Sequence, residues 1–152
     1  MDTQRCTVYT DACTRFRAVI EAGTGKLITS TISRASVGVV INFENGEKHI
    51  IARPVGTLET TYAEFLALYF ACKDLLAKGV TKVDFYTDCI NLALAINQGT
   101  ISGIEAMRKL TYTILGLLDR FEDFTITWVP RRDNKEANDV ARKAINKKRP
   151  AI

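Results

Sequence analysis

Two segments of this chain end in the same three residues, and this repeat limits the folds that the chain can adopt. Val8-Tyr9-Thr10-Asp11 and Phe85-Tyr86-Thr87-Asp88 each place an apolar, β-branched and aromatic run directly before a carboxylate. Runs of this kind are typical of β-strands. If the two strands lie in one sheet, Asp11 and Asp88 meet at their carboxyl ends. Two carboxylates placed side by side are suited to hold a hard divalent cation.

The predicted elements around these segments alternate in type. We expect strands over residues 5–11, 36–43, 48–55, 82–88 and 124–129, and helices over residues 59–78, 90–98, 104–121 and about 134–147. Asn45-Gly46 predicts a tight hairpin. The polar, Ser/Thr-rich and basic residues 12–35 indicate a long loop or an irregular hairpin. This order predicts an α/β fold, a five-stranded mixed sheet with helices on both faces.

Length and composition predict a single domain over residues 1–152, with a flexible basic tail from about residue 147. No apolar run reaches the roughly 20 residues of a membrane span, and Met1–Arg5 lacks the pattern of a signal peptide. The four cysteines have no CxxC spacing, which favours buried thiols in a reducing compartment. We therefore expect a cytoplasmic protein, and a monomer.

The basic residues gather near the C-terminus. Residues 131–149 hold eight Lys and Arg against three Asp and Glu, a net +5 in a chain whose total is +4. Such a segment suggests a polyanionic partner, nucleic acid first. The alternative is a solvated helix face followed by a frayed tail.

A third carboxylate, Glu64, lies in the first turns of the helix predicted over residues 59–78. It stands between Ala63 and Phe65, beside the apolar stripe of that helix, so its side chain is partly buried and needs a partner. A cation shared with Asp11 and Asp88 would satisfy it. Thr60 or Thr61 could cap this helix, and Glu64 could instead complete a capping box with Thr61. An Asp after a strand is often only a cap or turn residue.

In these runs the chain resembles the ribonuclease H type 1 family, in the variety that lacks a basic protrusion. The matching runs, in order, are Tyr9-Thr10-Asp11, Tyr62-Ala63-Glu64-Phe65-Leu66-Ala67-Leu68, Tyr86-Thr87-Asp88, Trp128-Val129-Pro130-Arg131 and Asn134-Lys135-Glu136-Ala137-Asn138-Asp139-Val140-Ala141. The resemblance covers nearly the whole chain. It implies a ribonuclease H-like fold and an endonuclease that uses Mg²⁺ or Mn²⁺ to hydrolyse the RNA strand of RNA–DNA hybrids.

The resemblance also implies roles for individual residues. Asp11, Glu64 and Asp88 match the family's first three catalytic carboxylates. The place of the fourth is taken by Asn138, a neutral and poorer ligand, and Asp139 follows one position later, turned by about 100° along the helix. In a two-metal mechanism Asp11 would bridge both ions, and Asn138 or Asp139 would help to hold the second.

Seven residues are candidates for contact with nucleic acid. The basic ones could bind phosphates; the others, which lie near the carboxylates, could contact a 2′-hydroxyl. They are Arg131, Arg132, Lys135, Arg142, Thr60, Thr61 and Cys89. Thr60-Thr61 stands where the family has a pair of Asn residues. The family's glycine-rich turn after the first Asp and its mobile histidine have no counterpart. The one histidine, His49, lies in a predicted hairpin strand and is interpreted as a surface or structural residue.

Three other functions remain open at this level. The same fold could bind nucleic acid without cleaving it, after losing the fourth ligand. It could serve as an interaction domain whose basic end binds an acidic protein. It could also cleave a different substrate, such as DNA. Dependence on Mg²⁺ and a panel of substrates separate these possibilities.

Overall fold

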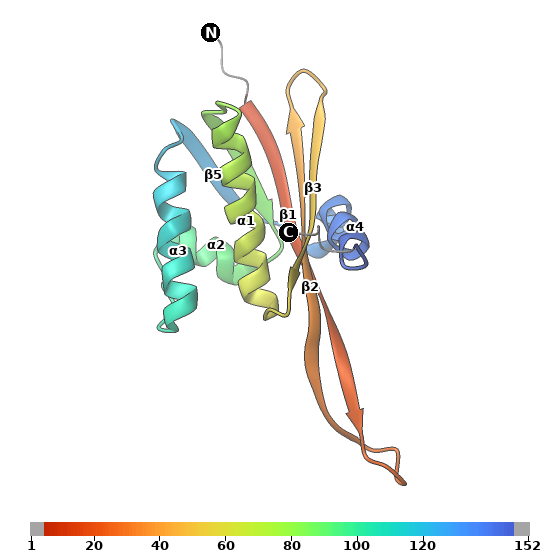
Figure 1. The fold of residues 1–152 in the computed structure, drawn as a ribbon. Coiled ribbons are helices and arrows are strands. Elements are labelled where there is room, and N and C mark those ends of the chain that lie inside the picture. Colours follow the sequence, from red (N-terminus) through yellow and green to blue (C-terminus); the bar gives the residue numbers. More distant parts are fainter. Residues whose placement is uncertain (1–4, 148–152) are drawn as a thin grey trace.

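The computed structural model of the chain describes residues 5–147, which form a mixed sheet with helices on both faces (Figure 1). The sheet has five strands in the order β3-β2-β1-β4-β5. The strands are β1 (Arg5–Ile20), β2 (Leu27–Phe43), β3 (Lys48–Gly56), β4 (Lys82–Thr87) and β5 (Asp123–Trp128). The helices are α1 (Thr60–Ala77), α2 (Ile90–Gln98), α3 (Glu105–Leu118) and α4 (Lys135–Ala144), with a short 3₁₀ turn, η1 (Arg131–Asp133), before α4. The predicted fold class and order of elements are confirmed.

The sheet register aligns the two repeated Tyr-Thr-Asp segments with each other. β1 and β4 are parallel neighbours, and their pairing sets Tyr9 opposite Tyr86 and Thr10 opposite Thr87. The two tyrosine rings stack with centroids 5.0 Å apart. Asp11 and Asp88 follow this last pair, so the register brings both carboxylates to one end of the β1–β4 pair.

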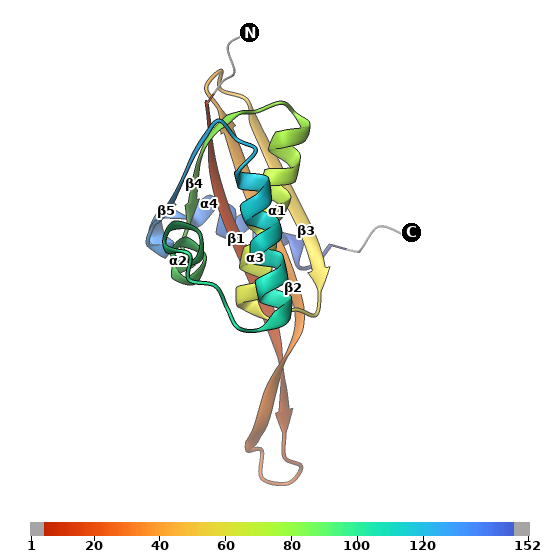
Figure 2. The same cartoon turned by 90° about the vertical axis from the view of Figure 1, so that its left-hand side faces the viewer.

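Helices α1, α2 and α3 cover one face of the sheet, and α4 lies alone on the other (Figures 1 and 2). The predicted apolar stripe of α1 is buried against the sheet, because Phe65, Leu68, Cys72 and Leu75 recur at three- and four-residue steps. α3 packs beside α1 in the same layer. The core therefore lies between the sheet and this layer, while α4 adds a thinner contact of small residues.

The segment over residues 12–35 is more regular than a loop. β1 does not end at Asp11 as predicted but continues to Ile20, and β2 begins at Leu27, so the two strands form one long antiparallel hairpin. Register shifts at Arg15/Phe16 and Val19/Ile20 make it irregular, which was one of the two predicted alternatives. Asp11 thus lies within a strand, at the point where only the parallel pairing with β4 stops.

Helix capping differs from the prediction. Glu59, not Thr60 or Thr61, is the N-cap residue of α1, and no side chain caps that helix or α4. α4 ends at Ala144, a few residues earlier than expected. Most of the predicted tail from about residue 147, and the N-terminal residues before Arg5, lie outside the described residues. No helix within residues 5–147 is long and apolar enough to cross a bilayer.

Candidate metal centre

Asp11 is buried inside the sheet and held at both oxygens. Its side chain is 2% exposed. Oδ1 accepts a hydrogen bond from the backbone N–H of Ala12 at 2.8 Å, and Oδ2 accepts one from Nδ2 of Asn138 on α4 at 2.9 Å. Two fixed donors orient the carboxylate without neutralising its charge, as expected for a residue prepared to bind a cation.

Glu64 approaches the same point from α1. Its Oε1 accepts a hydrogen bond from the N–H of Ala12 at 3.2 Å, and its Oε2 is buried with no hydrogen-bond partner among the described residues. The side chain is only 6% exposed. Burial, and then the charge of Asp11, raise the pKa of Glu64 well above its usual value. A buried carboxylate oxygen without a donor costs stability, and a cation bound there would satisfy it.

Asp88 completes the group from the turn between β4 and α2. Burial and the charge of Asp11 raise its pKa, and the side chain of Asn134 lowers it. One ligand oxygen from each of Asp11, Glu64 and Asp88 lies within 4.8 Å of the other two. Three acids this close repel one another, and a divalent cation would relieve that repulsion. The unpaired Oε2 and the mutual repulsion therefore both fit a metal site.

The three carboxylates open into a cleft of about 280 Å³. The cleft is lined by Asp11, Ala12, Cys13, Thr14, Thr60, Glu64, Asp88, Arg131 and Asn138. Most of these side chains are polar, and a guanidinium stands beside the carboxylates. The arrangement is suited to a metal together with a phosphate.

Asn138 and Asp139 take different places on α4. Asn138 lines the cleft and bonds to Asp11, whereas Asp139 forms an ion pair with Arg142. Asp139 lines a neighbouring hollow of about 390 Å³, together with Arg131, Arg132, Lys135, Asn138 and Arg142. Of the two candidates for the fourth ligand, the structure thus brings Asn138 to the carboxylates and turns Asp139 away.

The other predicted contacts divide between three places. Arg131 lines both the cleft and the basic hollow, and Arg132, Lys135 and Arg142 line the hollow alone. Thr60 lies at the cleft, where its hydroxyl hydrogen-bonds to that of Thr14 at 3.0 Å. Thr61 instead lines a pocket between α1, α2 and α3.

Cys89 is the N-cap residue of α2 and is partly exposed. Burial raises the pKa of its thiol to about 11, so the sulfur stays protonated at neutral pH. Cys13, at the cleft, is also partly exposed, while Cys6 and Cys72 are buried. The prediction of buried free thiols therefore holds for two of the four cysteines, and all four are free.

Two contributors to the site were not predicted. The backbone N–H of Ala12 donates to both Asp11 and Glu64, and a sequence does not show where a backbone donor points. Asn134 is buried, and its Nδ2 donates to the carbonyl oxygen of Thr10 at 2.9 Å, beside the carboxylates. Its place among the polar residues that open α4 was the only sequence signal.

Replacing Glu64 by Gln should stabilise the protein in the absence of metal. The pKa of Glu64 is raised in the folded state, so its contribution to stability is full below the ordinary carboxyl pKa of about 4.3 and is lost as the pH rises through the folded-state pKa. We expect Glu64→Gln to melt at a higher temperature than wild type at pH 8 in EDTA, and the difference to shrink towards pH 4. Adding Mn²⁺ should stabilise wild type more than the variant. A variant that melts below wild type in EDTA at pH 8 would contradict this.

Known proteins resemble this chain over most of its length. A family model described as Reverse transcriptase-like matches residues 23–144. No curated protein sequence matches the chain. Among solved structures, RNase H1 from the halophilic archaeon Halobacterium salinarum NRC-1 is 22% identical, with a TM-score of 0.74 over 93% of this chain and 98% of that one.

Two further structures extend the likeness. LC11-RNase H1 in complex with an RNA/DNA hybrid is 20% identical, with a TM-score of 0.75 over 93% of this chain and 96% of that one. The N-terminal RNase H domain of a Mycobacterium tuberculosis protein, solved as a fusion with maltose-binding protein, is 17% identical, with a TM-score of 0.76 over 95% of each chain. These likenesses show that the chain has the ribonuclease H-like fold predicted from its sequence.

Proposed function

Because the chain belongs to the Reverse transcriptase-like family, we propose that it is a metal-dependent endonuclease that hydrolyses the RNA strand of RNA–DNA hybrids. The observation that supports this most strongly is the cluster of Asp11, Glu64 and Asp88, with one buried oxygen of Glu64 unpaired. A structural relative, LC11-RNase H1, has been solved with an RNA/DNA hybrid. As the sequence resemblance indicates, we assign the chain to the type 1 variety without a basic protrusion.

Asp11, Glu64 and Asp88 would hold Mg²⁺ or Mn²⁺. When bound, the metal would supply an activated water and stabilise the charge that develops on the leaving 3′ oxygen. The protein keeps the receiving carboxylates oriented: Ala12 donates its N–H to two of them, and Asn138 holds Asp11 from α4. This preorganisation reduces the rearrangement needed when the cation and the phosphate arrive.

Arg131 is the residue best placed to bind the phosphate next to the metal, since it lines the cleft with the carboxylates. Arg132, Lys135 and Arg142 would contact neighbouring phosphates from the basic hollow. Thr60 is the candidate for contact with a 2′-hydroxyl, because its side chain lies at the cleft. Thr61 and Cys89 are weaker candidates, the first because it lines another pocket and the second because a thiol is a weak donor.

A cleavage assay on labelled strands tests the proposal. We expect the RNA strand of a hybrid to be cut in Mg²⁺ or Mn²⁺, no cleavage in EDTA, and little cleavage of double-stranded DNA or single-stranded RNA. Cleavage that persists in EDTA would exclude the mechanism. Salt-sensitive binding of the hybrid without cleavage in either metal would favour the second candidate, a non-catalytic binding domain. That candidate is supported by the neutral Asn138 at the place of an acid.

Asn138→Asp should increase metal binding and cleavage. The new carboxylate would add a charge beside Asp11, and changes next to a metal site alter affinity or activity by about 10–100-fold. We expect a lower Mg²⁺ requirement, together with a lower melting temperature in EDTA, because a donor to Asp11 is replaced by a repelling acid. Titrations of cleavage rate with Mg²⁺ measure the first effect. Asn146→Asp, an exposed position past the end of α4, is the control with the same charge change. Equal Mg²⁺ requirements in both variants would contradict this prediction.

A further inference from the structure

The hairpin of β1 and β2 extends far past the site as an isolated two-stranded ribbon. We call this ribbon, residues 15–34, the arm. Figures 1 and 2 show the arm projecting beyond the sheet and all four helices. Residues 15–31 are all exposed. The two strands of the arm are paired from Arg15 opposite Arg34 to Ile20 opposite Leu27. A turn closes the end of the arm, where the N–H of Glu21 donates a hydrogen bond to the carbonyl oxygen of Lys26. At about 3.3 Å per residue, six paired residues reach roughly 20 Å from the body.

The two faces of the arm differ, because residues opposite each other in an antiparallel pair lie on the same face. One face is mainly apolar and holds the pairs Phe16–Ile32, Ala18–Ser30 and Ile20–Leu27. The other is basic and polar and holds the pairs Arg15–Arg34, Arg17–Thr31 and Val19–Thr29. An extra residue in β2, Ser33, separates Ile32 from Arg34 and keeps the two on opposite faces.

The basic face of the arm continues the basic surface of α4. Alternation along β1 puts Arg15 and Arg17 on the same side as Asp11, and α4 covers that side, since Asn138 bonds to Asp11 there. Cys13 lies between Asp11 and Arg15 on the same side of β1, and it lines the cleft together with Arg131. The basic face of the arm therefore begins next to the cleft.

The charge of the arm is not balanced within the protein. Its four basic residues, Arg15, Arg17, Lys26 and Arg34, face a single acid, Glu21. Within the described residues none of the three arginines forms an ion pair. Arg15 and Arg34 stand directly opposite each other, and like charges in that position destabilise a strand pair. A polyanion along this face would remove the repulsion.

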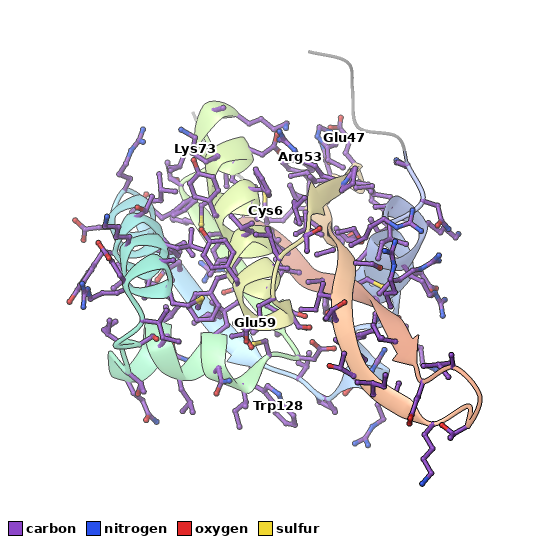
Figure 3. All side chains as sticks on the ribbon, turned by 60° about the horizontal axis from the view of Figure 1, so that its bottom comes forward. Cys6, Glu47, Arg53, Glu59, Lys73 and Trp128 are labelled. Atoms are coloured by element: carbon purple, nitrogen blue, oxygen red, sulfur yellow. The ribbon has the colours of Figure 1, made fainter. Side chains whose placement is uncertain are left out.

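We propose that the arm is a second nucleic-acid contact, whose arginines bind the backbone of a duplex that extends from the cleft. The proposal rests on the proposed function for the position of that duplex. The charge of the arm favours this occupant over a second copy of the chain, since two arms packed together would bring like charges together. In Figure 3 the arm lies at the lower right, and the labelled Trp128, at the end of β5, lies at the bottom of the same view.

Binding measured in EDTA separates this contact from cleavage. The arm variant is Arg15→Ser, Arg17→Ser and Arg34→Ser combined in the full chain. The control removes the same charge from exposed positions on the helical side: Lys73→Ser, Arg108→Ser and Arg120→Ser. Fluorescence anisotropy at several salt concentrations gives affinities for two hybrids, of about 20 and about 8 base pairs. At 3.4 Å per base pair the shorter hybrid is only about as long as the arm, so it cannot occupy the cleft and cover the whole arm at once.

We expect the arm variant to bind the longer hybrid at least tenfold more weakly than the control. The slope of log affinity against log salt concentration should also become shallower by up to about three, since each lost phosphate contact removes about 0.9 from it. The loss on the shorter hybrid should be smaller. A second variant, in which residues 15–34 are replaced by Asn-Gly between the paired residues Thr14 and Ala35, should show the same loss. Melting curves verify that both variants fold. If the arm variant and the control bind the longer hybrid alike, the proposal is wrong. A dimer in sedimentation that Phe16→Ser breaks would then identify a second copy of the chain as the partner of the arm.

The two proposals can fail separately. Wild type that binds hybrid through the arm but does not cleave it would refute the nuclease function and keep the arm contact. Wild type that cleaves, with an arm variant that binds the longer hybrid as the control does, would refute the arm contact alone.

Discussion

Asp88→Asn is expected to reduce cleavage of an RNA–DNA hybrid by more than about 100-fold, because even residues that only support a metal ligand are worth 10–100-fold. Asp88 contributes one of the three oxygens that lie within 4.8 Å of one another, and its replacement by an amide removes one of the three charges. The fold should be retained, since the repulsion that raises the pKa of Asp88 is relieved. Strand-specific cleavage in Mg²⁺ and in Mn²⁺ measures the effect.

The matched control is Asp74→Asn on α1, which removes a carboxylate whose partner is Lys78. That ion pair joins residues one helical turn apart on a solvated surface, so its loss should cost only about 0.3–0.5 kcal/mol and leave cleavage unchanged. Asp88→Asn with the activity of Asp74→Asn would mean that the cluster is not the catalytic centre.

Gly38→Ala should destabilise the protein by about 1–3 kcal/mol, the usual cost of overpacking. A Cβ on Gly38 would stand 2.5 Å from the carbonyl oxygen of Ala137 and 2.5 Å from the backbone nitrogen of Ala141, so α4 would have to move. Gly38 pairs with Asp11 across the hairpin. A displaced α4 would withdraw Asn138 from Asp11, so hybrid cleavage should fall together with the free energy of unfolding.

Urea denaturation of Gly38→Ala and Gly116→Ala gives this prediction a control of opposite sign. Gly116 lies in α3 with open space around it, and Ala is favoured over Gly inside a helix by about 1 kcal/mol. Gly116→Ala should therefore be more stable than wild type and equally active. A Gly38→Ala protein as stable as wild type would show that α4 is not held as closely as the structure indicates.

The sequence predicted the parts of this fold that depend on apolar periodicity. The stripe Phe65, Leu68, Cys72 and Leu75 predicted α1, and the two Tyr-Thr-Asp segments predicted neighbouring strands whose carboxylates meet. Burial of one face accounts for both successes, because a helix or strand with one buried face leaves its period in the sequence.

The arm was only partly predictable for the same reason. Residues 15–31 are exposed on both faces, so neither face had to be apolar throughout, and the ladder of backbone hydrogen bonds that holds the two strands has no sequence signal. Thr60 and Thr61 were predicted as candidate caps of α1, yet they lie inside its first turn, and the hydroxyl of Thr60 bonds to Thr14 on the hairpin. A tertiary contact replaced the local one.

At the site, the choice between Asn138 and Asp139 depended on the rotation of α4. One position along a helix is a turn of about 100°, so the direction of each side chain follows from how the helix packs on β2. That packing is set by the absence of a side chain at Gly38 and by the hydrogen bond from Ser36 Oγ to the carbonyl oxygen of Ala141. Both contacts join residues about a hundred positions apart and leave no local pattern.

Anomalous diffraction from crystals soaked in Mn²⁺ tests the central claim most directly. We predict a Mn²⁺ peak among the carboxylate oxygens of Asp11, Glu64 and Asp88, with Oε2 of Glu64 among its ligands. A second peak beside Asn138 would indicate a two-metal site, and its absence a site with one metal. No peak at the three carboxylates in saturating Mn²⁺, or a peak only at Asp139, would contradict the account.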